Sequence, residues 1–139
     1  MVYLIHINNV RGKYMADTII SEDLIGFDKG IFPISAIAEI IGIHVRTLRI
    51  YDDMNLLSPK RTKKNHRLYS LRDVERAKFI NYLTTDLGIN LMGVKLIIYL
   101  FEEQNVPIKN YIKKVEEIKG NLDIVGEKNY KKRGRKKAV

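Results

Sequence analysis

Two arginines lie three residues apart in the run from residue 44 to residue 52, which reads His-Val-Arg-Thr-Leu-Arg-Ile-Tyr-Asp. Side chains at positions i and i+3 share one face of a helix, so Arg46 and Arg49 would point the same way on a helix. An arginine can donate two hydrogen bonds to the O6 and N7 atoms of a guanine in the major groove of DNA. The spacing therefore predicts that at least one of these arginines contacts a base.

The polar neighbours of these arginines leave other roles open. Thr47 and Tyr51 are expected to offer hydroxyl groups to DNA phosphates. The alternative for Tyr51 is a half-buried ring that braces the following segment, and the two roles are compatible. Each arginine could instead contact phosphate alone, and Arg49 could pair with Asp52 or Asp53.

A strongly basic segment follows between residues 60 and 69. It is expected to form a hairpin with a polar tip at residues 62–66, whose cations would contact the DNA backbone or the minor groove. The alternatives are that His66 is an idle exposed side chain and that Tyr69 mainly packs while its hydroxyl stays in water. The DNA-binding residues predicted in this segment are Arg61, Lys63, Lys64, His66, Arg67 and Tyr69.

Two short helices joined by a tight turn would position the arginine pair. The first helix is expected to begin at Ser35 as its N-cap and to end at Gly42, a residue type that adopts positive φ easily. The second is expected to begin near His44, which would cap it, and to bury Leu48. Asn55 fits the left-handed residue that closes a helix.

Two more helices are predicted after the basic segment. Ser70 and Asp73 match the [ST]-x-x-[DE] capping box, which starts a third helix that Gly88 would end. Asn90 would cap a fourth. The expected inner faces of these helices comprise Val74, Ala77, Ile80 and Leu83 in the third and Leu91, Val94, Ile98 and Phe101 in the fourth.

A fifth helix begins around Pro107 and carries apolar residues at the spacing of a coiled-coil seam. A helix with so few apolar residues cannot bury such a stripe alone. Packing against its own domain is one interpretation, and pairing with a second copy of the chain as a homodimer is the favoured one. The predicted dimerisation residues are Ile108, Tyr111, Val115, Ile118 and Leu122.

Composition restricts the possible functions. The chain of 139 residues has a net charge of +9, and residues 105–139 carry 11 Lys and Arg against 4 Asp and Glu, which favours a polyanionic partner. Cysteine is absent, so disulfides and thiolate metal sites are excluded. The three histidines do not suggest a metal site, and no cofactor is predicted. The sequence offers no phosphate-binding Gly loop and no nucleophile-base pair, so an enzyme is disfavoured.

The two ends of the chain have weaker patterns. Residues 1–33 are expected to form an irregular arm in which Val2–Ile7 could make a short strand, and translation could begin at Met15. The basic tail, expected to be disordered when free, contains Arg133 and Arg135 in an Arg-Gly-Arg core like that of an AT-hook, which enters the minor groove. A nonspecific electrostatic tail is the alternative. Without an apolar run of membrane length or a signal peptide, a cytoplasmic location is expected.

Residues 34 to about 100 resemble the DNA-binding domain of the MerR family of bacterial transcription regulators. The resemblance rests on residues 47–52, Thr-Leu-Arg-Ile-Tyr-Asp, and on residues 67–70, Arg-Leu-Tyr-Ser. Three stretches, residues 44–49, 57–62 and 88–95, are similar to the heat-shock repressor branch, HspR. That branch usually carries Pro and Gln where Val45 and Arg46 stand, so the DNA sequence read by this chain can differ.

The resemblance implies a winged helix-turn-helix homodimer that binds an inverted-repeat operator in double-stranded DNA near a promoter. Members of the HspR-like branch repress chaperone genes, with the chaperone itself as co-repressor. A transcription regulator, and specifically a repressor, is therefore the leading hypothesis. An architectural or excisionase-like winged-helix factor is the alternative.

The predicted fold is mainly α, with a winged helix-turn-helix domain, a small β-hairpin wing and a C-terminal dimerisation helix. The predicted organisation is an arm at residues 1–33, the DNA-binding domain at 34–104, a dimerisation helix at 105–125 and a basic tail at 126–139.

Overall fold

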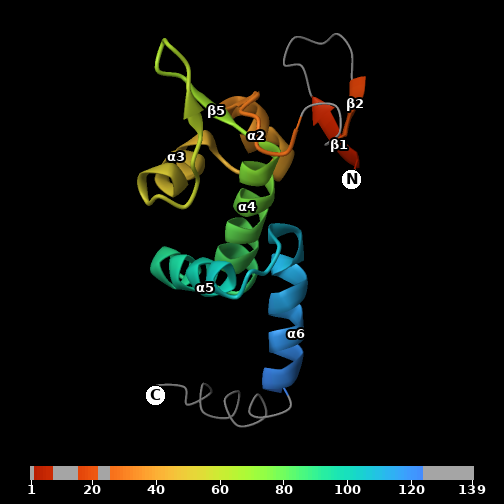
Figure 1. Cartoon of the computed structure of the whole chain (residues 1–139), viewed down its shortest axis with the longest axis vertical. Coiled ribbons are helices and arrows are strands. Elements are labelled where there is room, and N and C mark those ends of the chain that lie inside the picture. Colours follow the sequence, from red (N-terminus) through yellow and green to blue (C-terminus); the bar gives the residue numbers. More distant parts are fainter. Residues whose placement is uncertain (1, 8–15, 22–25, 124–139) are drawn as a thin grey trace, which may run out of the picture.

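The computed structural model describes residues 2–7, 16–21 and 26–123, and its fold is mainly helical, as predicted (Figure 1). The strands are β1 (Val2–Ile7), β2 (Ala16–Ser21), β3 (Phe32–Pro33), β4 (Lys60–Arg61) and β5 (Arg67–Tyr69). The helices are α2 (Ile34–Ile41), α3 (Val45–Asp53), α4 (Leu71–Asn81), α5 (Leu91–Glu103) and α6 (Tyr111–Asp123). Two short turns complete the list, the π-helical η1 (Tyr82–Asp86) and the 3-10 helix η2 (Ile108–Asn110).

The described residues before α2 include regular strands that the predicted irregular arm did not contain. Strands β1 and β2 form a two-stranded antiparallel sheet, which confirms the strand expected at Val2–Ile7 and adds one that was not predicted. Nearer the domain, β3 pairs with β5, and Phe32 is buried in the core. The folded domain therefore begins before residue 34, because Phe32 and Pro33 pair with Tyr69 and Leu68 of β5.

The helix-turn-helix is formed by α2 and α3. Gly42 has a φ of 76°, and its N–H donates to the Ala38 carbonyl at 2.9 Å, so the glycine closes α2 as predicted. The N-cap of α2 is Pro33 and not Ser35, because pairing of β3 keeps Pro33 extended and the helix starts directly after it. His44 occupies the N-cap position of α3, but its side chain makes no capping hydrogen bond.

Helix α4 connects the two halves of the domain (Figure 1). The wing, which we define as residues 60–69 with β4 and β5, lies near the start of α4 together with α2 and α3, whereas α5 and α6 lie near its end. The predicted capping box is present: the Asp73 N–H donates to Ser70 Oγ at 3.1 Å and the Ser70 N–H donates to Asp73 Oδ2 at 2.9 Å. The predicted inner residues Val74, Ala77 and Ile80 are all buried.

The helical stretch after α4 was only partly predicted. Leu83 is buried as expected and Gly88 has a φ of 66°, but the stretch widens into the π-helical turn η1 before it ends. Helix α5 follows the expected plan, since the Asn90 side chain accepts the Gly93 N–H at 2.8 Å. Its residues Val94, Ile98 and Phe101 are buried, and Leu91 packs against the core.

Helix α6 is anchored to its own domain by aromatic rings. The ring of Tyr111 lies 5.0 Å from that of Phe79 and 5.2 Å from that of Phe101, both in edge-to-face arrangements. Tyr111 and Val115 are buried, so the first turns of α6 belong to the core of this chain. No helix in the described ranges is long and apolar enough to cross a membrane.

Candidate nucleic-acid interface

Helix α3 separates its apolar and cationic side chains onto different faces. Leu48 and Tyr51 are buried, whereas Arg46 and Arg49 are exposed. Neither arginine forms an ion pair with a residue that the structure describes. Their guanidinium groups are therefore presented to solvent with their donors available, as the i, i+3 spacing predicts.

Two tyrosines predicted to bind DNA lie inside the protein instead. Tyr51 is 3% exposed and Tyr69 is 0% exposed, and the hydroxyl of Tyr69 is itself buried. Burial raises the pKa of Tyr51, whose hydroxyl is hydrogen-bonded to Thr84 of η1. Burial, helped by the charge of Asp52, raises the pKa of Tyr69 to about 12. The expectation that Tyr69 mainly packs is confirmed, whereas its expected water-exposed hydroxyl is wrong. Tyr51 is more deeply buried than the half-buried ring of its alternative, and its contact with phosphate stays a prediction.

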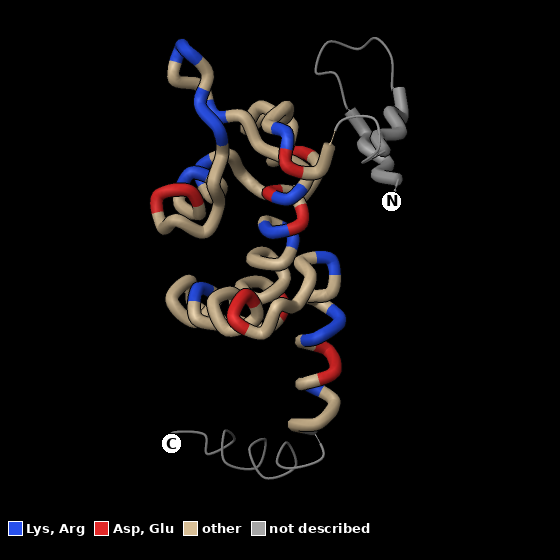
Figure 2. The backbone as a smooth tube through the Cα atoms, in the orientation of Figure 1, with Lys and Arg blue, Asp and Glu red and all other residues tan. Residues whose placement is uncertain are grey.

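The wing is a short hairpin with a cationic tip. The Thr62 N–H donates to the His66 carbonyl at 2.9 Å, and Asn65 turns the chain with a φ of 63°. Lys63, Lys64 and His66 are exposed around this turn. Figure 2 shows Lys and Arg along the wing and on the neighbouring α3, so these cations lie on one side of the molecule.

The two arginines of the wing lie directly opposite each other. Arg61 of β4 pairs in register with Arg67 of β5, which places two like charges on one short hairpin. Asp52, in the last turn of α3, contacts both: Arg67 Nε donates to Asp52 Oδ2, and Arg61 Nη2 lies 3.5 Å from the same oxygen. The hydrogen bond with Asp52 raises the pKa of Arg67 further above its usual range. We call this arrangement of Asp52, Arg61 and Arg67 the clasp.

Sequence reasoning missed the clasp. It offered Asp52 and Asp53 as partners of Arg49, whereas both carboxylates face the wing: Arg67 Nη2 lies 3.8 Å from Asp53 Oδ1. The signal available in the sequence was an acidic pair at the end of the cationic helix, followed nine and fifteen residues after Asp52 by the arginines at positions 61 and 67.

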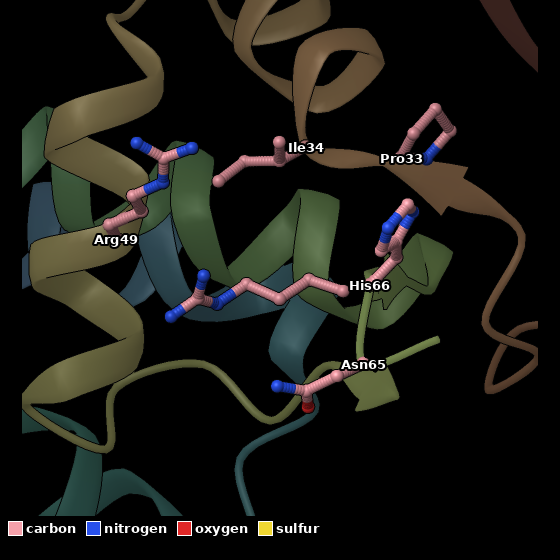
Figure 3. Close-up of a pocket in the computed structure, with 6 residues that line it drawn as sticks. Pro33, Ile34, Arg49, Asn65 and His66 are labelled. Carbon is pink, nitrogen blue, oxygen red and sulfur yellow. The ribbon is translucent and has the colours of Figure 1, made fainter. Parts of the chain in front are cut away.

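A hollow of about 260 Å³ lies between α3 and the wing (Figure 3). Arg49 borders it from α3, and Asn65 and His66 border it from the wing. Pro33 and Ile34, at the start of α2, form another side. Because Arg67 also lines this hollow, the structure brings a helix arginine and two wing residues of the predicted set around one open space.

The remaining predicted residues are placed unevenly. Thr47 is partly exposed on α3, and Arg61 is exposed on the wing. Arg133 and Arg135 lie outside the described residues. Of the predicted dimerisation residues, Tyr111 and Val115 are buried within the chain and Ile108 packs against its core, whereas Ile118 is 39% and Leu122 is 62% exposed. No group of three His, Asp or Glu within the described ranges could hold a metal ion.

Comparison with known sequences identifies relatives of part of the chain. It is 45% identical over 73 residues to the putative heat shock protein HspR of Streptomyces coelicolor, covering 52% of this chain and 48% of that protein. It is 37% identical over 79 residues to the HTH-type transcriptional regulator GlnR of Bacillus anthracis, covering 57% of this chain and 60% of that protein. The chain thus spans about half of the first relative and three fifths of the second. GlnR is named as a transcription regulator and neither relative is named as an enzyme.

Comparison with solved structures and with family models gives further matches. HiNmlR, described as a MerR family regulator that lacks the sensor domain and is bound to promoter DNA, is 27% identical and aligns with a TM-score of 0.45 over 66% of this chain and 78% of that chain. The N-terminal part of MtaN from Bacillus subtilis is 25% identical, with a TM-score of 0.46 over 69% of this chain and 100% of that chain. The family model described as MerR HTH family regulatory protein matches residues 32–110, which is more than half of the sequence. The chain therefore belongs to the MerR family of helix-turn-helix regulatory proteins.

Proposed function

We propose that this chain binds double-stranded DNA in a sequence-specific manner and thereby regulates transcription. The observation that carries the proposal is the exposure of Arg46 and Arg49 on α3, on the side of the molecule where the wing presents its cations. Helix α3 would enter the major groove and the wing would contact the flanking backbone, which is the way winged helix-turn-helix proteins divide these tasks.

The expected binding energies agree with base reading by α3 and phosphate contacts by the wing. A two-pronged contact between an arginine and a guanine contributes about 1–3 kcal/mol of discrimination between bases. Lys63 and Lys64 at the wing tip would contribute affinity through phosphates, without reading sequence. Arg46 and Arg49 therefore account for specificity, and the wing lysines account for the dependence of affinity on salt.

Pairing of two copies would match an inverted-repeat operator. Exposed apolar side chains on α6, Ile118 and Leu122, support a homodimer, because such residues are costly in water unless another surface covers them. Helix α5 adds a second set of exposed apolar residues to the surface that a partner copy would cover. These are Met92, Leu96, Tyr99 and Leu100.

The target genes are proposed from the resemblance to the HspR-like branch and from the identity with the putative heat shock protein HspR. On that basis the chain represses chaperone or other heat-shock genes in the bacterial cytoplasm, with a chaperone as co-repressor. The transcriptional regulator GlnR, which is 37% identical, supports transcription regulation without this target class.

Selection of duplexes from a random library with the full chain, followed by footprinting on the source genome, tests the proposal. Enrichment of one inverted repeat, found upstream of a few promoters, is the expected result. Failure to enrich any sequence would overturn sequence-specific binding. Arrays of sites beside attachment sites would instead support the architectural alternative.

A further inference from the structure

The position of Asp52 is electrostatically unfavourable in two respects. It lies in the last turn of α3, where the carbonyl end of the helix dipole repels negative charge, and that turn contains no basic residue. It also lies beside the cationic surface proposed to meet DNA, where a carboxylate repels phosphates. A carboxylate that is repelled by the helix dipole and would be repelled by phosphates needs a favourable contact to offset both repulsions.

The compensating contact is the clasp. Arg61 and Arg67 face each other across a hairpin of only two and three residues per strand, and like charges directly opposite each other destabilise a strand pair. A hairpin this short is marginal by itself in water, and its β5 strand pairs with β3 through only two residues of each strand. The Asp52 side chain is 15% exposed and that of Arg67 is 22% exposed, so water screens their contact only partly. The carboxylate therefore joins the end of α3 to both strands of the wing.

We propose that Asp52 is a positioning residue that sets the angle between α3 and the wing, and that this angle determines how well the protein discriminates its operator from other DNA. The inference rests on the proposed function. A protein that reads bases with a helix and grips phosphates with a hairpin gains specificity only when both fit one duplex at once. The clasp holds the hairpin at one angle before DNA arrives.

The positioning role and simple electrostatics predict different effects of removing the Asp52 charge on DNA binding. Replacing Asp52 by Asn removes a negative charge from the DNA-facing surface and releases two arginines for phosphates. Charge alone then predicts tighter binding to every duplex. Positioning predicts tighter binding to nonspecific DNA together with a loss of preference for the operator.

Asp53 provides the matched control. It is the neighbouring acid on the same helix turn, its side chain is 73% exposed, and its only described ion pair is the 3.8 Å contact with Arg67. Asp53→Asn makes the same change in charge at nearly the same place and leaves the clasp intact. Asp52→Glu keeps the charge and tests rescue by a carboxylate that is one methylene longer.

The experiment measures the affinity of the full chain and these variants for the selected operator and for a scrambled duplex of equal length, over a series of salt concentrations. For Asp52→Asn, the ratio of the two affinities is expected to fall about tenfold. Its salt slope on scrambled DNA is expected to steepen by about one for each arginine released to a phosphate. Asp53→Asn should raise both affinities equally, and Asp52→Glu should retain most of the preference. Equal ratios in Asp52→Asn and Asp53→Asn would overturn the inference.

A measurement without DNA separates this inference from the proposed function. In NMR spectra of the free protein, the Arg67 Hε proton should exchange slowly with water in the wild type and in Asp53→Asn, and rapidly in Asp52→Asn. Thermal melts of the three variants identify any global loss of folding. A wild type without preference for any duplex would overturn the proposed function, whereas unchanged Hε exchange in a folded Asp52→Asn would overturn the clasp itself.

Discussion

The arginines on α3 and those on the wing are in different electrostatic environments. Arg46 and Arg49 are exposed without an ion pair to any described residue, so all their donors can serve a base. Arg67 shares its guanidinium with Asp52 and Asp53 and would have to contact DNA with its remaining donors. Base reading is therefore expected mainly from α3, and the contribution of Arg67 is expected to depend on its carboxylate partner.

Replacing Arg49 by Ala tests whether this side chain reads a base. Operator affinity should fall roughly ten- to a hundredfold, because a two-pronged guanine contact is lost, while affinity for scrambled DNA falls much less. Lys113→Ala, an equal change of charge on exposed α6, controls for net charge and should alter both affinities equally and slightly. Equal losses on the two duplexes for Arg49→Ala would reassign this arginine to phosphate.

Tyr69 makes stability depend on alkaline pH. Its pKa is raised from 10.0 to about 12, so the folded protein holds this proton more tightly than the unfolded chain does. The contribution of the protonated Tyr69 hydroxyl to the stability of the folded state is complete below pH 10 and is lost as pH rises from about 10 to about 12. Tyr69→Phe should make this alkaline loss smaller, although Tyr51 and Tyr111, whose pKa values are also raised, still contribute.

The same variant has an expected effect at neutral pH. The Tyr69 hydroxyl is buried without a hydrogen-bond partner among the described residues, so its removal should raise the free energy of unfolding by about 1 kcal/mol. Urea unfolding at pH 7 and at several values above pH 9 measures both effects. A loss of stability in Tyr69→Phe at pH 7 would show that the hydroxyl has a partner.

Among the elements, α4 has the best-defined beginning. Its reciprocal capping box joins Ser70 and Asp73, and the same Asp73 side chain accepts the Ser58 N–H at 3.4 Å. The start of the helix is thereby tied to the segment that leads into the wing. Loss of the cap would affect the whole domain, because α4 connects its two halves (Figure 1).

Ser70→Ala should lower the free energy of unfolding by about 1 kcal/mol, the usual effect of losing a serine cap. Ser35→Ala is the control within this chain, since sequence patterns place a cap there and the structure places an exposed residue inside α2. It should leave stability unchanged or slightly increased, because alanine favours helix interiors. Chemical denaturation compares the two variants, and a larger loss for Ser35→Ala would contradict the observed start of α2.

Local sequence patterns predicted the elements whose signals are local. Gly42 and Asn55 adopt positive φ, and the Ser70 and Asn90 caps form, because each depends on residues only a few positions away. The start of α2 was misplaced because pairing of β3 with β5, far along the chain, determines it. The π-helical turn η1 was missed, and no local signal in the sequence distinguishes it from an α-helix.

For the whole molecule, the candidate site was predictable in its exposed part and not in its buried part. Helical spacing sufficed to place Arg46 and Arg49 outward. The burial of Tyr51 and Tyr69 and the pairing of Asp52 with the wing depend on how separate elements meet, and one sequence does not contain that information in a local form. The predicted dimerisation residues also fall into two groups: the first ones pack against this chain's own α4 and α5, and the last ones are exposed.

The exposed apolar side chains of α6 make self-association of the chain testable. Leu122→Asp places a charge on the most exposed apolar side chain of α6 and should shift the proposed dimer towards monomer, because a buried carboxylate is costly at an apolar interface. Asn121→Asp introduces the same charge at the adjacent exposed position and should leave the dimer intact. Sedimentation equilibrium measures both. A Leu122→Asp variant that associates like the wild type would remove α6 from the interface.

The three rings of Phe79, Phe101 and Tyr111 hold α6 to the domain that carries α3. A twofold pair joined through α6 would therefore hold its two copies of α3 at a fixed separation and orientation. The distance between the two copies of α3 in such a pair would then be set by this aromatic packing and not by the DNA. One added base pair between half-sites turns the far half-site by roughly 35° about the duplex axis, and two rigidly held α3 helices cannot follow that rotation.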